Sequence, residues 1–128
     1  MSATARIDER GLIWFFVRIT GRRGSAIYRG CMDTGACYCV FNEHDCLNLG
    51  LSRKDREKIR LITVKGETIA KVYTASLMTV VGTELKAQNV DVVAKNVKGF
   101  PLILGINFLK NFNWKYDKET TDFTLSRT

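Results

Sequence analysis

The chain is divided into short apolar runs separated by turn-forming residues, and this division is the strongest limit on its fold. Residues 12–20 are aromatic and β-branched, which predicts a strand. The sequence Gly-Arg-Arg-Gly at 21–24 predicts a tight turn, and residues 25–32 predict the returning strand. Many short strands with few helices are typical of a mostly-β barrel or sandwich.

Further strands follow the same pattern. One hairpin is predicted from residues 59–64 and 68–73 around a turn at 65–67, and another from residues 77–81 and 85–93 around Gly82. Shorter strands are predicted at residues 40–41, 102–104, 114–116 and 123–125.

Helical signals are few and short. Residues 42–49 predict a short helix that Gly50 ends as a C-cap. The spacing of apolar residues after Ile106 suits one or two helical turns. Ser52 resembles a helix N-cap with Asp55 in the first turn, so a helix start is also predicted there.

The composition indicates one folded domain of 128 residues, in which 45% hydrophobic residues are enough to form a core. We assign residues 1–10 to a polar N-terminal extension and residues 11–128 to the domain. No apolar run approaches the roughly 20 residues that cross a bilayer, and the N-terminus has no signal-peptide pattern. We therefore expect a cytoplasmic protein with no membrane partner.

The net charge of +7 raises the question of nucleic acid. Basic residues are densest at 53–60, where acidic residues are interleaved with them, as on a solvated surface. This stretch also lacks the aromatic residues on which bases stack. Nucleic acid is therefore an unlikely partner.

A group of cysteines with the only histidine forms a candidate metal site. The zinc-ligand types are Cys37, Cys39, His44 and Cys46, but their spacing matches no common zinc finger. We favour reduced thiols, with Cys37, Cys39 and Cys46 as small buried hydrophobic residues and Cys31 in the core. No metal is expected.

Asp33 is the residue that carries most chemical information. It directly follows a predicted strand and precedes Thr34, Gly35 and Ala36. A carboxylate at a strand end requires hydrogen-bond partners, and the glycine indicates a tight loop that passes close to other atoms. Taken alone, Asp-Thr-Gly is equally typical of an ordinary turn after a strand.

The order of the motifs resembles the retropepsin-like aspartic proteases. That family has an apolar-Asp-Thr-Gly-Ala loop, then β-hairpins, then an apolar-apolar-Gly strand before a short helix, and the resemblance extends from Leu12 to the last strand. It implies a mostly-β fold: a closed barrel, one lobe per chain, with one or two short helices. It also implies that Asp33 is catalytic, that Thr34 hydrogen-bonds across a dimer axis, and that Gly35 allows close backbone approach, with Ala36 completing the loop.

Two further segments receive roles from this resemblance. The hairpin tip corresponds to a flap that closes over a bound peptide; it consists of Val64, Lys65, Gly66 and Glu67. The second motif corresponds to a strand that packs beside the catalytic loop; it consists of Ile103, Leu104 and Gly105.

The chain also departs from the retroviral pattern. An Arg and an Asp that often form an ion pair in viral members are replaced by Ile106 and Cys37. The flap tip has Gly66 alone where viral flaps are rich in glycine. The resemblance is therefore to the wider class more than to a virus.

A single Asp-Thr-Gly in 128 residues implies a homodimer, because this hydrolysis needs two carboxylates. Our first hypothesis is a cofactor-free endopeptidase that cuts peptide or protein substrates between bulky apolar residues. The alternatives are a non-catalytic module on the same fold that binds a peptide or protein, and a basic, zinc-stabilised nucleic-acid binder. The intact motif favours the enzyme.

Overall fold

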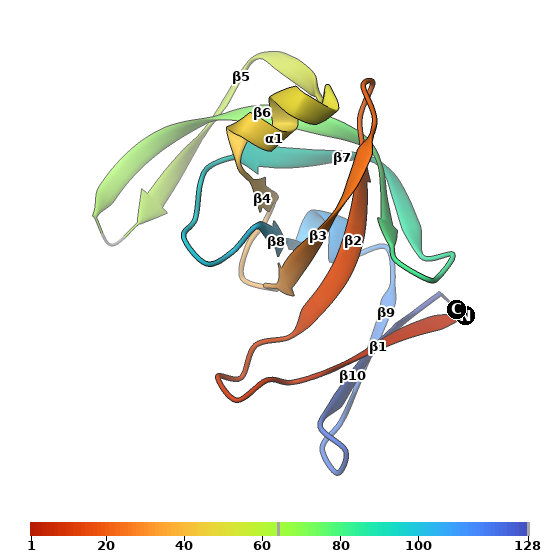
Figure 1. Cartoon of the computed structure of the whole chain (residues 1–128). Coiled ribbons are helices and arrows are strands. Elements are labelled where there is room, and N and C mark those ends of the chain that lie inside the picture. The colour runs from red at the N-terminus through yellow and green to blue at the C-terminus, as the bar shows by residue number, and fades with distance from the viewer. Residues whose placement is uncertain (64, 128) are drawn as a thin grey trace.

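A computed structural model describes residues 1–63 and 65–127, and in it the chain is mostly β, with 58% strand and 9% helix (Figure 1). The described helices are α1 (Glu43–Leu49) and α2 (Ile106–Leu109). The described strands are β1 (Ser2–Arg6), β2 (Trp14–Thr20), β3 (Ser25–Met32), β4 (Cys39–Phe41), β5 (Ser52–Thr63), β6 (Gly66–Val80), β7 (Lys86–Ala94), β8 (Leu102–Leu104), β9 (Asn113–Asp117) and β10 (Asp122–Ser126).

A closed six-stranded barrel forms the body of the molecule, as expected for the predicted fold class. Its strands follow the order β2-β3-β8-β4-β7-β6, and pairing between β2 and β6 closes the ring. β5 continues the sheet beyond β6. Two of the pairings, β3 with β8 and β4 with β7, are parallel, and they bring together strands that are distant in the sequence.

Alternation of side chains along the strands explains which face is inside. In β2, Phe15, Val17 and Ile19 are buried, whereas the intervening Phe16 and Arg18 are exposed. A strand projects successive side chains to opposite faces, so this pattern places one face of β2 in the core.

The predicted first helix is confirmed as α1. The side chain of Asn42 accepts a hydrogen bond from the backbone N–H of Asp45 at the helix start. Gly50 ends the helix in the left-handed region, with φ of 69°. Local sequence signals were sufficient here because both caps lie within the segment itself.

A second, three-stranded sheet joins the two ends of the chain, in the order β1-β10-β9. Ser2–Arg6, within the segment assigned to a polar extension, pairs antiparallel with Asp122–Ser126. The two termini therefore lie side by side (Figure 1).

The predicted helix start at Ser52–Asp55 is wrong, because this segment begins β5. Ser52 pairs with Thr74 and Arg53 with Tyr73 in the long strand β6. That strand also serves both predicted hairpins, since it runs without a break through residues 68–73 and 77–80 and ends one residue before the predicted limit at 81. Pairing across the sheet outweighs the local capping signal, as tertiary context often does.

Candidate active site

Asp33 lies immediately after β3, in a loop held by its own hydrogen bonds. The Asp33 N–H donates to the carbonyl of Leu104 in β8 (2.9 Å), and the carboxylate Oδ1 accepts from the N–H of Gly35 (2.9 Å). The Asp33 carbonyl accepts from the N–H of Ala36 (3.2 Å). The side chains of Asp33 and Thr34 are exposed, and Gly35 is exposed with them. The loop therefore presents a fixed carboxylate to solvent.

The second motif packs against this loop. β8 lies between β3 and β4, with Cys31 beside Ile103 and Met32 beside Leu104. The N–H of Ile106 donates to the carbonyl of Ala36 (2.8 Å). A Cβ at Gly105 would lie only 2.4 Å from the backbone of Tyr38, so glycine is required for this approach. The structure thus brings the two predicted motifs together.

Asn107 is a supporting residue that the sequence analysis missed. Its Oδ1 accepts from the N–H of Cys39 (2.9 Å), and its Nδ2 donates to the carbonyl of Asp91 (2.7 Å). It therefore ties α2 to β4 and β7. The sequence signal for Asn107 was its position two residues after Gly105. Its hydrogen-bond partners become apparent only in the fold.

An apolar stripe crosses the sheet on the face of β3 that bears Cys31, two residues before Asp33. The register across the neighbouring strands then aligns a row of apolar residues, namely Cys31, Ile103, Val40, Val93 and Val72. Ile103 and Val40 are half-buried, which leaves apolar surface available beside the loop.

The outer part of the β5–β6 hairpin extends from the barrel as an arm (Figure 1). Ile59 lies opposite Ala70, and Leu61 lies opposite Thr68. Ala70 and Val72 are two residues apart in β6, so the side of the arm that bears Ile59 and Ala70 shares the face of the apolar stripe.

The predicted flap residues lie at the end of this arm. Glu67 forms an ion pair with Arg60, and Gly66 has φ of 111°, which favours glycine. Lys65 lies in the turn beside them, and Val64 lies outside the described residues. Within one chain, the arm tip is apart from the loop that bears Asp33 (Figure 1).

Comparison with known proteins places these features in a family. Residues 17–111, more than half of the chain, match the family model described as "gag-polyprotein putative aspartyl protease". The chain belongs to the retropepsin-like aspartic proteases. The fold is similar to that in the crystal structure of a retropepsin-like aspartic protease from Rickettsia conorii. That similarity has a TM-score of 0.72 and 18% identity, and it covers 99% of this chain and 91% of the other. No curated protein sequence matches the chain.

The cysteines of this retropepsin-like chain are all free thiols, and they differ sharply in exposure. Cys31, Cys39 and Cys46 are buried, but Cys37 is exposed, so the prediction that Cys37 is a buried residue is wrong. Cys37 directly follows the exposed loop that bears Asp33. Burial raises the pKa of Cys39 and of Cys46 to about 12.

A metal centre built from these cysteines has no support in the geometry. Among the side chains that the structure describes within residues 1–63 and 65–127, no group of three His, Cys, Asp or Glu could hold a metal ion. His44 instead lies 3.0 Å from the amide nitrogen of Asn48, one turn along α1. In the same described ranges, no helix combines the length and the apolar character needed to cross a membrane.

Thiol labelling of the native protein is expected to modify one cysteine per chain rapidly. Cys37 is exposed, whereas burial protects the other three and suppresses the thiolate of Cys39 and Cys46. Mass spectrometry after brief treatment with an alkylating reagent should find the label on Cys37, and Cys37→Ser should abolish it. Equal labelling of Cys39 in the native state would contradict the packing described here.

Proposed function

We propose that the chain is an aspartic endopeptidase that acts as a homodimer, in which each subunit contributes Asp33 to a shared pair of carboxylates. The exposed and fixed carboxylate of Asp33 carries this proposal. The Asp-Thr-Gly motif occurs once in the sequence. One chain therefore supplies one such carboxylate, and the second must come from another chain. A twofold dimer would bring the same loop from each subunit to the axis.

The chemistry follows from two carboxylates that share one proton. Adjacent carboxylates do not readily both ionise, so one carboxyl holds a proton while the other stays charged. The charged Asp33 takes a proton from water as the water oxygen attacks the peptide carbonyl carbon, and the protonated Asp33 gives its proton to the carbonyl oxygen. Transfer of a proton to the amide nitrogen then releases the amine and the carboxylic acid.

The surroundings of Asp33 support individual roles for the other loop residues. Thr34 is exposed beside Asp33, where its hydroxyl can hydrogen-bond across the dimer axis. A Cβ at Gly35 would lie 3.3 Å from Asp33 Oδ1, so glycine leaves room for the carboxylate and for a substrate. The carbonyl of Ala36 accepts a hydrogen bond from the N–H of Ile106, directly after the second motif, which fixes the end of the loop.

The apolar stripe supports extended peptides with bulky apolar side chains as substrates. The half-buried Ile103 and Val40 lie beside the loop and can contact such side chains. The β5–β6 arm would act as the flap that covers the peptide, with Val64, Lys65, Gly66 and Glu67 at its tip. Closure of such an arm excludes water from the reacting bond.

We also propose the boundaries of the protease domain and the compartment in which it acts. Residues 11–128 would form the protease domain, and residues 1–10 would extend it by supplying β1. Four free cysteines suit a reducing compartment, so we assign the enzyme to the cytoplasm.

Dilution is expected to lower the hydrolytic rate per chain. A monomer has one Asp33, whereas the dimer has two, so activity should follow the dimer fraction. The rate would be measured against a mixed peptide library at acidic and neutral pH, over protein concentrations from nanomolar to micromolar, with sedimentation at the same concentrations. A rate per chain that stays constant while the dimer dissociates would contradict the shared site, and a folded dimer that cuts no peptide would contradict the proposed activity.

A further inference from the structure

The β5–β6 arm joins the barrel at a break in strand pairing. Arg53 of β5 pairs with Tyr73 of β6, but the next pair along the ladder is Lys58 with Lys71. Residues 54–57 therefore lie opposite Val72 alone. Such a bulge interrupts the ladder of hydrogen bonds and bends the strand that contains it.

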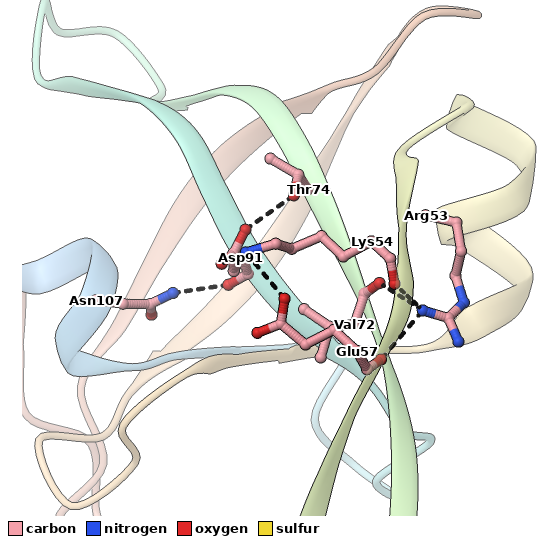
Figure 2. Close-up of polar contacts among 7 residues, drawn as sticks. All are labelled: Arg53, Lys54, Glu57, Val72, Thr74, Asp91 and Asn107. Carbon is pink, nitrogen blue, oxygen red and sulfur yellow. Dashed lines mark hydrogen bonds and ion pairs between the residues drawn. The ribbon is translucent and has the colours of Figure 1, made fainter.

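Arg53 holds the backbone of this bulge. Its Nη1 donates to the carbonyl of Lys54, to that of Glu57 (3.1 Å) and to that of Val72 (3.3 Å) (Figure 2). These carbonyls lie at both ends of the bulge and on the strand opposite it. One guanidinium therefore joins both ends of the bulge to the strand opposite it.

Lys54 links the bulge to the barrel. Its ammonium lies 3.1 Å from the carboxylate of Glu57, at the arm end of the bulge, and 3.0 Å from Asp91 Oδ2 in β7. The Thr74 hydroxyl donates to the other oxygen of Asp91 (2.8 Å). Figure 2 shows the Lys54 side chain crossing β6 to reach Asp91. The two carboxylates raise the pKa of Lys54, with the Asp91 hydrogen bond as the largest cause.

The Asp91 end of this link is firmly held, whereas the arm is not. The Asp91 side chain is 26% exposed, and its carbonyl accepts from Asn107, which also binds the backbone of Cys39. Beyond the bulge, Ile62 is 88% exposed and Ile69 is 64% exposed. A segment with little apolar burial opens at low free energy, so movement should be concentrated in the arm.

We propose that residues 54–57 are the hinge of the β5–β6 arm and that Lys54 is a positioning residue which latches it, by joining Glu57 to Asp91. The latch limits how far the arm moves from the apolar stripe. The hinge itself is independent of catalysis, while its role in holding substrate rests on the proposed function.

Hydrogen exchange tests the latch directly. In Lys54→Met, amides of the arm at residues 58–62 and 66–71 are expected to exchange about two- to tenfold faster, as for the loss of a partly exposed ion pair. Amides of β2 and β3 should be unchanged. Lys86→Met, which removes the same charge from β7, is the matched control and should leave the arm unchanged. Unchanged arm exchange in Lys54→Met, or equal acceleration throughout the chain, would overturn the latch.

Two further measurements separate a latch from a general structural effect. The double variant Lys54→Met/Asp91→Asn should exchange no faster in the arm than Lys54→Met, because both changes break the same contact. In the unaltered protein, 1 M salt should accelerate arm exchange by screening the ion pair, and Lys54→Met should lose this sensitivity. Additive effects in the double variant would contradict the proposal. An unaltered arm that is insensitive to salt would contradict it even if Lys54→Met failed to fold.

Kinetics connect the hinge to substrate. For a peptide that the enzyme cleaves, Lys54→Met is expected to raise KM about two- to tenfold and to change kcat less than about twofold, because a loose arm weakens binding without altering Asp33. A lowered kcat with unchanged KM would overturn the positioning role. If neither protein cleaves peptides, the proposed function fails, and the exchange measurements still decide the hinge.

Discussion

Replacement of Asp33 by asparagine is expected to reduce peptide hydrolysis by about a thousandfold or more, with the fold retained. Asparagine has the same shape and can still accept the N–H of Gly35 through its oxygen, so the loop should keep its form. It cannot take a proton from water or hold a proton for the carbonyl oxygen, however. In a homodimer the substitution removes both carboxylates, and a general acid–base pair contributes about a hundred- to ten-thousandfold per group.

The measurement is initial hydrolysis of a peptide that the unaltered enzyme cleaves, at several pH values. Circular dichroism and thermal unfolding of Asp33→Asn provide the control for folding. A second test adds excess Asp33→Asn to the unaltered enzyme, which should lose activity as mixed dimers form with one carboxylate. Hydrolysis by pure Asp33→Asn at more than about a tenth of the original rate would exclude Asp33 as the catalytic acid–base.

Replacement of Gly105 by alanine is expected to lower the free energy of unfolding by about 2–4 kcal/mol, as for a severe overpacking change. The added Cβ would lie 2.4 Å from both the carbonyl carbon and oxygen of Tyr38, and 2.9 Å from the oxygen of Ala36. All of these are backbone atoms, which cannot rotate away. The backbone at Gly105 has φ of −86° and ψ of 176°, open to any residue, so the effect is purely steric.

Activity should fall with stability, because the clash lies between the two motifs. The hydrogen bonds from Ile106 to Ala36 and from Asp33 to Leu104 lie on either side of Gly105 and set the position of the loop that bears Asp33. Urea unfolding measures the loss of stability. Peptide hydrolysis at a temperature where the variant is folded measures the loss of activity. Gly99→Ala is the control, because its Cβ meets no atom within 4 Å and only its positive φ is unfavourable, which costs about 1 kcal/mol. A Gly105→Ala protein as stable as Gly99→Ala would contradict the packing.

Local signals predicted much of the fold. β3 and β8 were placed at residues 25–32 and 102–104, and the structure has them there. Helix α1 was predicted with its end at Gly50, since its caps are contained in the sequence. The closed barrel was predicted from the family resemblance. Alternation of apolar and polar residues predicts the strands and their buried faces, but it does not show which strands are neighbours.

The errors arose where distant residues decide the structure. Ser52 has the local character of a helix cap, yet pairing with Thr74 places it in a strand. Cys37 was taken as buried by residue type, but it follows a loop that projects to solvent. Asn107 has no sequence signal for its two partners, which lie in β4 and β7.

By itself, therefore, the sequence determined most of the strands, the capped helix and the Asp33 loop, because the interactions that specify them lie within a few residues. Only the tertiary structure decided how the motifs meet. Parallel pairing placed Ile103 beside Cys31, and the bulge at residues 54–57 separated the arm from the barrel. These features depend on hydrogen bonds and packing between strands far apart in the chain, which no local pattern encodes.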